Sequence, residues 1–432
     1  MTAMAIDTAD RLLKRPSGPN SAMDLPTHLS VHGPLGIPGR DDRSYRDGIL
    51  RAVAESGLLG RGGAGFPSAV KWDAVRRSGR RPLLVVNAME GEPASAKDRV
   101  LLCYSPHLVL DGAEVAAAVI GAGEIVVCIS EDSDASAASV EAAIAERQAA
   151  GRRRRFVVER PPAHYVAGEE SALVNWLATE QSLPFQRVDK SVPLRVGRRT
   201  ALVHNAETLS QVALIARHGP GWFRGAGTAD APGTTLVTVS GAVRSPGVIE
   251  VELGTPIADV LARSGADARL SGVLVGGYGG AWLDASRLST PYAPGPLAAA
   301  GATHGVGILV ALPSSSCGIA ETARIVRYMA GQSAGQCGPC VFGLPALADD
   351  LELLWSGRAD AELFERISRR AAQIDGRGAC RHPDGVVRLV RSAFQTFAAD
   401  VHAHAAGRPC RGHDAPTVLY FPRPKASVGR AS

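Results

Sequence analysis

Short apolar runs alternate with longer segments of helical composition between about residue 46 and residue 225. The apolar runs are typical of strands that are buried on both faces of a parallel sheet, and they occupy 83–87, 125–130 and 155–159. The helical segments occupy 45–56, which stops at Gly57, 106–121 and 135–150. Strands that alternate with helices in this way predict an open α/β sheet.

The pattern changes twice after this region. Short strands surround one helix from about 232 to 313, which predicts a small α+β module with strands at 235–240, 248–251, 272–275 and 307–312 and a helix at 257–264. The spacing is helical from about 319 onward, with helices expected at 319–330, 344–356, 359–374 and 386–405. Four helices of this length predict a bundle.

These patterns divide the 432 residues into about three domains and two ends. The N-terminal arm is rich in Gly, Pro and Ser, and the C-terminal tail is rich in Pro, Arg and Ser, so both are expected to be irregular. The predicted division is an arm at 1–45, an α/β domain at 46–230, the α+β module at 231–315, the helical bundle at 316–410 and a flexible tail at 411–432.

The charge pattern argues against nucleic-acid binding. The net charge is +5, from 47 basic and 42 acidic residues. The densest basic run, at 152–155, has no interleaved aromatic residues, so we expect a solvated loop or helix end there.

Hydropathy argues against membrane insertion. The most apolar stretch, at 108–129, is interrupted by Asp111, Glu114 and Glu124. Charged residues at positions 7, 10 and 11 break any signal-peptide core. The seven cysteines are an odd number, which favours metal chemistry in a reducing compartment over disulfides. A cytoplasmic protein is therefore expected.

The loop at 60–67 reads G-R-G-G-A-G-F-P and contains the spacing G-x-G-x-x-G at Gly60, Gly62 and Gly65. A dinucleotide-binding fingerprint follows a strand, whereas a helical segment precedes this loop. Its glycines still allow backbone N–H groups to approach a phosphate or a flat ring, and Arg61 could neutralise a phosphate, with Lys71 a little further on. The alternative is a tight surface loop.

Two acidic segments add to this picture. The segment 87–93, N-A-M-E-G-E-P, directly follows a predicted strand, and ligands bind at the carboxyl ends of the strands of α/β sheets. Glu169 and Glu170 follow Gly168, with Tyr165 just before them. Acidic residues at a helix N-terminus would explain each segment alone. Together with the glycine loop, the two segments favour a cofactor site.

Cys337 and Cys340 form a C-x-x-C pair, and Cys380 follows. Thiolates in this arrangement suit an iron–sulfur cluster or zinc. A fourth ligand is missing from the pattern, and its candidates are Cys317, His382 and an exogenous group. The alternatives are a degenerate site and a thioredoxin-like redox pair, which normally lies in a βαβ setting. Of the other cysteines, Cys103 and Cys128 are expected in the core and Cys410 is uninformative.

These segments, in this order, resemble one family. It is the NADH-binding flavoprotein subunit of respiratory complex I, with its relatives in NAD-linked hydrogenases and formate dehydrogenases. The resemblance runs from about residue 50 to 405. It is carried by the glycine loop, Lys71-Trp72, 87–93 with Lys97-Asp98-Arg99, Tyr165 with 168–170, His204-Asn205-Ala206-Glu207-Thr208-Leu209, and Gly335-Gln336-Cys337-Gly338-Pro339-Cys340 with Cys380.

The resemblance implies a Rossmann-like domain for FMN and NADH, a ubiquitin-like β-grasp module and a four-helix bundle with a [4Fe–4S] cluster. It implies catalytic contacts from Glu92 and Glu170 and cluster ligation by Cys337, Cys340 and Cys380. The cofactor-binding residues that it implies are Gly60, Arg61, Gly62, Gly63, Gly65, Phe66, Lys71, Asn87, Glu90, Tyr165, Gly168, Glu169, Asn205 and Thr208, and among these Phe66 and Lys71 would contact NADH.

The chain departs from the family pattern at four positions. Met89 stands where the family has an acidic residue beside the flavin, and Ala74 where a second adenine-stacking aromatic often lies. His204 replaces an asparagine. Ala334 replaces the first cysteine of the family's S-C-G-x-C-x-x-C motif, so the cluster is expected to be [3Fe–4S], to recruit another ligand or to be absent.

Three functional hypotheses follow. The first is an NADH-oxidising enzyme that passes single electrons to a partner iron–sulfur protein, because the chain has no further ferredoxin-like cysteine set. The second is a non-catalytic or cofactor-depleted subunit, motivated by Met89, Ala74 and Ala334. The third is a flavoprotein that takes electrons from a reduced protein. Acidic residues near a ribose would disfavour the 2′-phosphate of NADPH, although the choice of nucleotide stays open.

Overall fold

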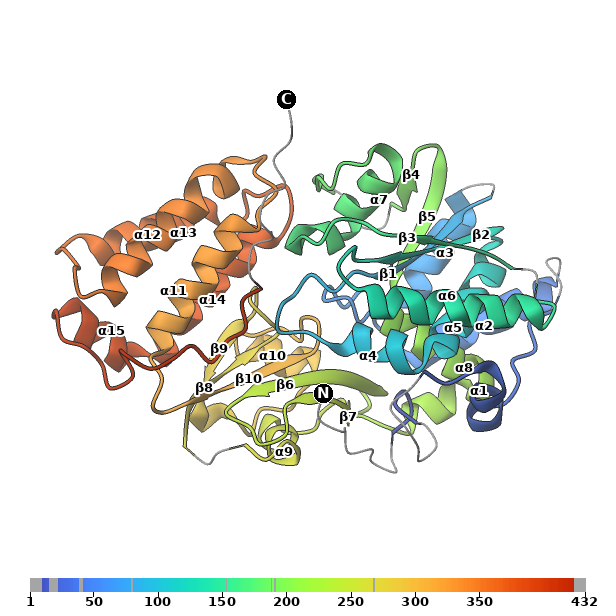
Figure 1. Ribbon diagram of the computed structural model, residues 1–432, viewed down its shortest axis with the longest axis horizontal. Coiled ribbons are helices and arrows are strands. Elements are labelled where there is room, and N and C mark those ends of the chain that lie inside the picture. The colour runs from blue at the N-terminus through green and yellow to red at the C-terminus, as the bar shows by residue number, and fades with distance from the viewer. Residues whose placement is uncertain are drawn as a thin grey trace.

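The computed structural model describes residues 10–14, 22–38, 42–78, 81–152, 154–187, 189, 192–266 and 269–422. Figure 1 shows an α/β domain on the right, a smaller β-sheet domain at the bottom centre and a helical domain on the left. They follow one another along the chain in the order that the hydrophobic pattern predicts. The predicted α/β class of the first domain and the helical class of the last are confirmed.

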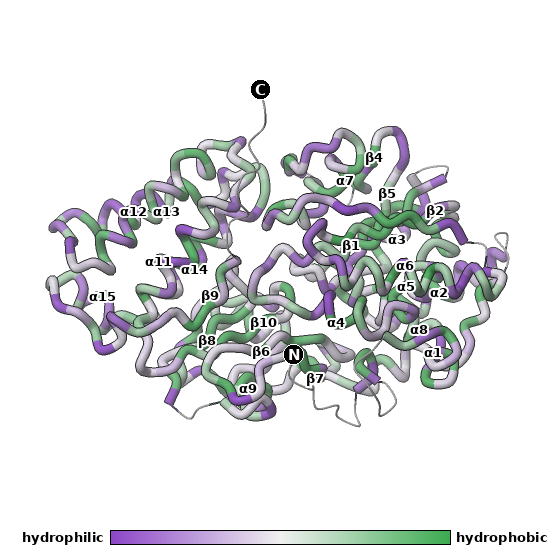
Figure 2. The backbone as a smooth tube through the Cα atoms, in the orientation of Figure 1, coloured by the Kyte–Doolittle hydropathy of each residue, from purple (hydrophilic) through white to green (hydrophobic). Residues whose placement is uncertain are grey.

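The first sheet has the strand order β3-β2-β1-β5-β4. All neighbours are parallel except the edge strand β4. Leu84 and Val86 of β1 face one core, and Leu83 and Val85 face another, which explains the uninterrupted apolar run. Figure 2 shows β1 and β2 as hydrophobic stretches in the middle of this domain. The strands are β1 Leu83–Ala88, β2 Glu124–Ile129, β3 Arg155–Glu159, β4 Leu194–Val196 and β5 Arg199–Asn205.

Helices cover both faces of this sheet. Helix α5 is buried along its whole length, and its two buried carboxylates, Asp111 and Glu114, are paired with Arg147. The 3₁₀ turn η1, Tyr165–Gly168, leads into α7. Helix α8 is broken at Gly219. The helices are α2 Arg43–Ser56, α3 Ser68–Ser78, α4 Lys97–Tyr104, α5 Pro106–Ile120, α6 Asp134–Ala149, α7 Glu170–Thr179 and α8 Ala206–Arg224.

The second sheet has the order β7-β6-β10-β8-β9, with β6 and β10 parallel and the other pairs antiparallel. The hydrophobic pattern predicts four of these strands and α9. It misses β9 and α10, which are both short. The elements are β6 Thr234–Gly241, β7 Gly247–Glu252, α9 Ile257–Arg263, β8 Leu270–Val275, β9 Ala281–Asp284, α10 Pro294–Ala299 and β10 Ile308–Pro313.

The helical domain packs around a core that includes Leu347, Leu351 and Val386. The helix expected at 386–405 is two helices, because the chain breaks at Phe397, whose ring packs edge-on against Trp282 at 5.2 Å. A π-helical turn, Pro339–Gly343, precedes α12. The helices are α11 Gly318–Gly331, α12 Leu344–Trp355, α13 Leu363–Ile374, α14 His382–Thr396 and α15 Ala398–Ala405.

The prediction of an irregular N-terminal arm is wrong for residues 25–32 and 43–45, which are helical. Residues Leu25–His32 form helix α1, and Asp24 caps it by accepting a hydrogen bond from Thr27 N. Leu12 is fully buried, and its N–H donates to the Glu250 carboxylate at 2.7 Å. The arm therefore packs on the domains, because buried contacts compensate for its weak local pattern. Residues 1–9, 15–21 and 39–41 lie outside the described residues.

The prediction of a flexible tail is wrong for residues 411–422. Leu419 is 5% exposed, and Thr417 Oγ1 donates to Glu321 Oε2 at 2.9 Å. Tyr278 Oη donates to the Tyr420 carbonyl. Hydrogen bonds to α11 and to the second sheet therefore hold this segment in place. Residues 423–432 lie outside the described residues.

The basic run at 152–155 makes contacts within its own domain. Arg152 Nη1 lies 3.3 Å from Glu114 Oε2, and Arg155 Nε lies 3.1 Å from Glu124 Oε2. Within the described ranges, no helix has the length and hydropathy that a membrane span requires.

Candidate functional site

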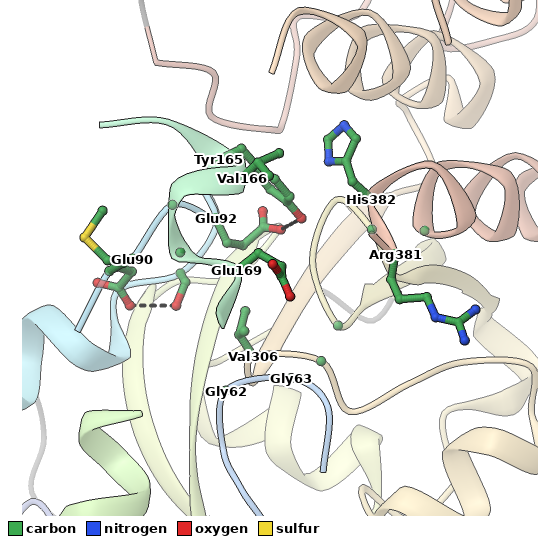
Figure 3. A pocket seen from close by; sticks show the side chains of 18 of the residues that line it. Gly62, Gly63, Glu90, Glu92, Tyr165, Val166, Glu169, Val306, Arg381 and His382 are labelled. Atoms are coloured by element: carbon green, nitrogen blue, oxygen red, sulfur yellow. Dashed lines mark hydrogen bonds between the residues drawn. The ribbon is translucent and has the colours of Figure 1, made fainter. Parts of the chain in front are cut away.

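A cavity of about 290 Å³ lies where the three domains meet (Figure 3), close to the lower end of the size range of ligand pockets. Its lining mixes glycines with carboxylates and amides. The α/β domain contributes Gly62, Gly63, Asn87, Met89, Glu90, Gly91, Glu92, Ser95, Asp98, Tyr165, Val166, Gly168, Glu169 and Asn205. The second domain contributes Gly276, Gly279, Thr303, Gly305 and Val306, and the helical domain contributes Met329, Cys380, Arg381, His382, Gly385 and Arg388.

The glycine loop forms one wall of this cavity. It connects α2 to α3 and is not preceded by a strand, as expected from the sequence. Gly63 has φ +106° and forms an antiparallel bridge with Gly305 of the second domain. A Cβ at Gly62 would lie 3.3 Å from Asn205 Cβ. The loop backbone therefore lies close to the strand ends, and side chains at these positions would crowd the cavity wall.

Arg61 points away from the cavity. Its N–H donates to Thr208 Oγ1 at 2.9 Å, and its guanidinium donates to the Thr234 carbonyl at 3.1 Å. The side chain is 3% exposed and lies 3.9 Å from Glu207 Oε1. This position does not support the predicted neutralisation of a phosphate by Arg61. The guanidinium instead joins the α/β domain to the second sheet.

The carboxyl ends of β1 and β5 place two asparagines side by side. Asn87 and Asn205 are partners in the parallel register, so both lie at the edge where α/β sheets bind ligands. Asn87 Nδ2 donates to the Gly168 carbonyl at 2.9 Å. Asn205 Nδ2 donates to Asp98 Oδ2 at 2.6 Å, and Asn205 Oδ1 accepts from Lys97 Nζ at 2.9 Å.

Lys97 is a buried cation that the sequence analysis did not select. It is 1% exposed, and its Nζ lies 2.8 Å from Asp98 Oδ1 and 3.1 Å from Glu207 Oε2. Burial acts to lower the pKa of Lys97, but the two carboxylates outweigh it and raise that pKa above its ordinary value. The sequence K-D-R was visible, whereas the burial of its lysine depends on the packing of α4 against α8 and β6.

Glu90 organises the chain before α4. Its carboxylate accepts hydrogen bonds from Ser95 Oγ at 2.7 Å, Asp98 N at 3.0 Å and Arg99 N at 3.1 Å. Figure 3 shows the bond to Ser95 at the left of the cavity. Burial and the neighbouring Asp98 raise the pKa of Glu90. This carboxylate therefore shapes the cavity wall by capping a helix.

Glu92 and Tyr165 form a buried pair in the middle of the cavity (Figure 3). Glu92 Oε2 accepts from Tyr165 Oη at 2.9 Å and from Tyr278 N at 2.9 Å. Burial raises the pKa of Glu92 to about 7. The Tyr165 ring lies edge-on to His382, with 5.3 Å between ring centroids. A carboxyl group with this pKa changes its charge near neutral pH, which suits a group that binds or positions a reacting substrate.

Glu169 and Glu170 have separate surroundings. Glu169 lines the cavity and caps α7 by accepting from Ser171 N at 2.8 Å. Glu170 is paired with Lys71 of α3 and lies 3.5 Å from Arg187 Nη1. The cavity lining does not include Gly60, Arg61, Gly65, Phe66, Lys71, Glu170 or Thr208.

Cys380 lines the cavity, whereas Cys337 and Cys340 lie outside its lining. Cys340 is 5% exposed, its free thiol shares a hydrogen bond with that of Cys337, and burial raises its pKa to about 12. Burial likewise raises the pKa of Cys380 to about 11, with Cys337 contributing. Cys337 and Cys380 both contribute to the raised pKa of Cys340, which is consistent with three thiols in one region of the helical domain. His382 Nε2 bonds to the Met329 carbonyl at 2.9 Å, and its buried Nδ1 has no hydrogen-bond partner among the described residues.

Cys317 lies elsewhere. It caps the N-terminus of α11, whereas Cys337 and Cys340 follow the C-terminus of that helix of 14 residues. A helix of this length separates its ends by about 20 Å. Cys317 therefore cannot supply the missing cluster ligand. The Sγ of Cys317 lies within 4.8 Å of the ligand atoms of His404 and Cys410. Cys410 therefore belongs to a group of possible metal ligands, which its sequence context did not indicate. Cys128 is buried as expected, and Cys103 is half-buried.

Sequence reasoning also missed the walls that the other two domains contribute. The segment Gly276-Gly277-Tyr278-Gly279-Gly280 is a second glycine cluster, and it was a usable signal. A Cβ at Gly277 would lie 2.6 Å from Glu92 Oε2. Arg381 and Arg388 carry no local signal, because only the packing of α14 brings them to the cavity.

The α/β fold, the cavity shared by three domains and the thiol of Cys380 in its lining are features of a redox protein. Three family models match this chain. The Nuo51 FMN-binding domain matches residues 53–214, the SLBB domain matches 236–266, and the iron–sulfur binding region of NADH-ubiquinone oxidoreductase F matches 320–404.

Whole-chain comparisons agree. The second F-type NADH-quinone oxidoreductase polypeptide of Rhizobium meliloti is 30% identical over 384 residues, which are 85% of this chain and 91% of that protein. Its counterpart in Streptomyces coelicolor is 29% identical over 84% of each chain. A chain of an NAD⁺-reducing [NiFe]-hydrogenase in the air-oxidised state has 32% identity and a TM-score of 0.78, over 85% of this chain and 64% of that one.

This chain belongs to the family of the F-type polypeptides of NADH-quinone oxidoreductase. The predicted family is therefore confirmed, and with it an NADH-oxidising flavoprotein that has FMN and [4Fe–4S] regions. The small middle module is an SLBB domain. Cys317 and Cys410 lie outside the matched iron–sulfur region, whereas Cys337, Cys340 and Cys380 lie inside it.

Proposed function

We propose that this chain oxidises NADH at an FMN held in the three-domain cavity and passes electrons through Cys337, Cys340 and Cys380 to a partner iron–sulfur protein. One observation carries the proposal: Cys380 lines the same cavity as the glycine loop and the Glu92–Tyr165 pair. Residues suited to a flavin and a cluster ligand thus share one cavity. A cytoplasmic location stays a prediction.

The cavity suits a flavin through its backbone and its fixed polar groups. Gly62 and Gly63 present main chain without Cβ atoms, which lets a flat ring or a phosphate approach the N–H groups. Asn87 and Asn205 offer amides at the strand ends, held by Gly168 and Asp98. Bound FMN supplies the redox chemistry, because it accepts two electrons together and releases them singly.

Glu92 is the residue that we assign to the nicotinamide end of NADH. Its carboxylate is held by Tyr165 Oη and Tyr278 N, so its position is fixed before substrate binds. An ionised Glu92 accepts hydrogen bonds from an amide or a ribose hydroxyl. Tyr165 and Tyr278 orient it, and the burial that raises its pKa excludes water from this part of the cavity.

The rest of NADH would extend over the outer face of the glycine loop. Gly65 faces open space, and the half-buried Phe66 follows it with an aromatic face for adenine. Lys71 is paired with Glu170, and Glu170 also lies 3.5 Å from Arg187 Nη1. Hydrogen bonds from the nucleotide would replace part of this ion-pair cluster.

Three thiols in the helical domain suit an iron–sulfur cluster only in part, because Ala334 cannot bind iron. His382 is the nearest candidate for a replacement ligand, since its buried Nδ1 has no hydrogen-bond partner among the described residues and its backbone is two residues from Cys380.

Phe342 is 75% exposed just after Cys340, which offers an apolar contact to the proposed acceptor protein.

An anaerobic titration of the purified protein with NADH tests the proposal. The flavin absorption should bleach near one equivalent of NADH, and additional broad bleaching should report the cluster. Electron paramagnetic resonance then distinguishes a three-iron from a four-iron cluster. Protein that holds FMN and stays coloured with excess NADH would contradict the assignment. Ala334 favours a cofactor-depleted subunit as the second candidate, and iron far below cluster stoichiometry together with absent flavin would support it.

A further inference from the structure

A second group of metal-binding side chains lies at the N-terminal end of α11. The Sγ of Cys317 lies 3.3 Å from His404 Nε2, and the Sγ of Cys410 is within 4.8 Å of both. Cys317 is 2% exposed and His404 is 1% exposed. The proposed flavin and cluster chemistry uses none of these three residues.

The distances suit one tetrahedral ion. Zinc–sulfur bonds of about 2.3 Å and zinc–nitrogen bonds of about 2.0–2.1 Å place tetrahedral sulfur and nitrogen ligands about 3.5 Å apart. The measured 3.3 Å between Cys317 Sγ and His404 Nε2 is close to this value. Two thiolates and an imidazole favour zinc over magnesium, calcium or manganese, which prefer oxygen ligands.

A further nitrogen donor, on His413, lies beside this group but not within 4.8 Å of all three of its ligand atoms. The ring of His413 packs on that of His404, with 5.5 Å between centroids, and its buried Nδ1 has no hydrogen-bond partner among the described residues. The Asp400 carboxylate bonds with Cys410 on another side. A buried nitrogen without a partner costs free energy unless something binds it, and a metal ion would do so.

The backbone brings Cys410 to this place by a close approach. His413 N donates to the Cys410 carbonyl at 3.2 Å, which closes a turn. A Cβ at Gly412 would lie only 2.3 Å from the Ser316 carbonyl carbon. Glycine at this position therefore lets the turn lie against the residues that precede α11, next to Cys317.

We infer that Cys317, His404 and Cys410 hold a mononuclear Zn²⁺, and that the ring of His413 turns toward the ion to become the fourth ligand. The ion fastens the segment 406–422 to the helical domain. That segment reaches the cavity indirectly, because the Tyr420 carbonyl accepts from Tyr278 Oη and the Tyr278 N–H donates to Glu92. Zinc at this end of α11 thus supports a residue that positions Glu92.

Metal analysis of the whole protein, produced with zinc in the medium, tests this inference. We expect about one zinc per chain, as in a closed structural site. Cys317→Ser, Cys410→Ser and His404→Ala should lose it. Cys340→Ser is the matched control, because it should lose iron and keep zinc.

Two further measurements on the wild-type protein do not depend on variants: removal of the zinc and its replacement by cobalt. Removal of zinc by a chelator should lower the melting temperature and speed proteolysis of 406–422, and added Zn²⁺ should restore both. Co²⁺ in place of zinc should show the thiolate charge-transfer and visible bands of a tetrahedral site.

Four outcomes would overturn the inference. They are no zinc in the wild-type protein, zinc that survives in both Cys317→Ser and Cys410→Ser, a disulfide between these two cysteines in the protein purified under reducing conditions, and iron loss in Cys317→Ser equal to that in Cys340→Ser. None of these outcomes depends on whether NADH bleaches the flavin, so this inference and the proposed function can fail separately.

Discussion

The two ends of α11 carry similar sulfur and nitrogen donors, but the chain assembles them differently. At the C-terminal end, Cys337 and Cys340 lie in one turn, and Cys380 joins them beside the cavity. At the N-terminal end, Cys317, His404 and Cys410 come from three separate segments. The first group is recognisable from local spacing, and the second depends wholly on tertiary packing.

The difference lies in what each site can tolerate. A C-x-x-C turn brings two thiols together through local backbone geometry. The motif can therefore still be recognised in the sequence although Ala334 replaces the family's first ligand cysteine. The other site depends on the close approach of Gly412 to Ser316, and no short motif records it. Substitutions at the two ends of α11 should therefore affect iron and zinc content separately.

Cys340→Ser should have the largest effect. Serine is a poor iron ligand, so this variant removes one of the three proposed thiolate ligands of the cluster. Cys340 is 5% exposed, so water cannot easily take its place. We expect iron to be lost and electron transfer to a one-electron acceptor to fall by at least about tenfold. Zinc content should not change. Iron analysis measures the cluster content, and acceptor assays measure electron transfer. Cys103→Ser is the thiol control. Unchanged iron content in Cys340→Ser would refute the ligand assignment.

Glu92→Gln should lower activity while it raises stability at alkaline pH. Burial raises the pKa of folded Glu92 to about 7, so its favourable contribution is present below the unfolded value near 4.5 and is lost as pH rises through 7. At pH 8 the neutral glutamine should therefore stabilise the fold by about 3 kcal/mol. Loss of the charged acceptor should lower kcat/KM roughly tenfold.

Chemical denaturation and steady-state rates of wild-type protein and Glu92→Gln from pH 5 to pH 9 check this prediction. The stability gain should shrink as pH falls from 7 to 5, because unfolded Glu92 begins to take up its proton as pH approaches 4.5. The wild-type kcat/KM should rise through pH 7, whereas the variant should lack that rise. Equal pH profiles for both proteins would show that Glu92 does not act through its charge.

Gly412→Ala tests the other end of α11. The added Cβ meets the Ser316 and Cys317 backbone at 2.3–2.4 Å, so the turn must move. We expect a loss of about 1–3 kcal/mol in the free energy of unfolding and a lower zinc content. Gly331→Ala, at the C-terminal end of α11, is the matched control, because a Cβ there meets nothing within 4 Å. Similar unfolding free energies for both variants would refute the close approach.

Much of the fold could be predicted from the sequence because it depends on local periodicity. The strands at 83–87 and 155–159 are close to β1 and β3, since both are short apolar runs between breakers. Helix α1 and the packed segment 411–422 could not be predicted, because single contacts stabilise them against weak local preference. Examples are Leu25 N to Glu146 in α1 and Thr417 Oγ1 to Glu321 in the C-terminal segment.

The residues of the candidate site also fall into those that could be predicted from the sequence and those that could not. Asn87 and Glu92 follow a strong strand signal, so their place at the sheet edge could be predicted. The inward turn of Arg61 and the burial of Lys97 could not, because both depend on partners more than 100 residues away, such as Thr234 and Glu207. Sequence therefore predicts which segments meet a ligand better than it predicts which way each side chain points.

Lys71→Met should have the smallest effect on stability and still inform on NADH. The Lys71 side chain is 17% exposed and its partner Glu170 is 35% exposed, and Glu170 keeps Arg187 as a second partner. Loss of such a pair costs less than about 1 kcal/mol. If Lys71 contacts the nucleotide equally in ground and transition states, KM for NADH should rise about fivefold with kcat unchanged. Arg77→Met breaks the exposed pair with Asp73 on the same helix and should leave KM unchanged. An unchanged KM in Lys71→Met would confine NADH to the cavity and exclude the outer face of the glycine loop.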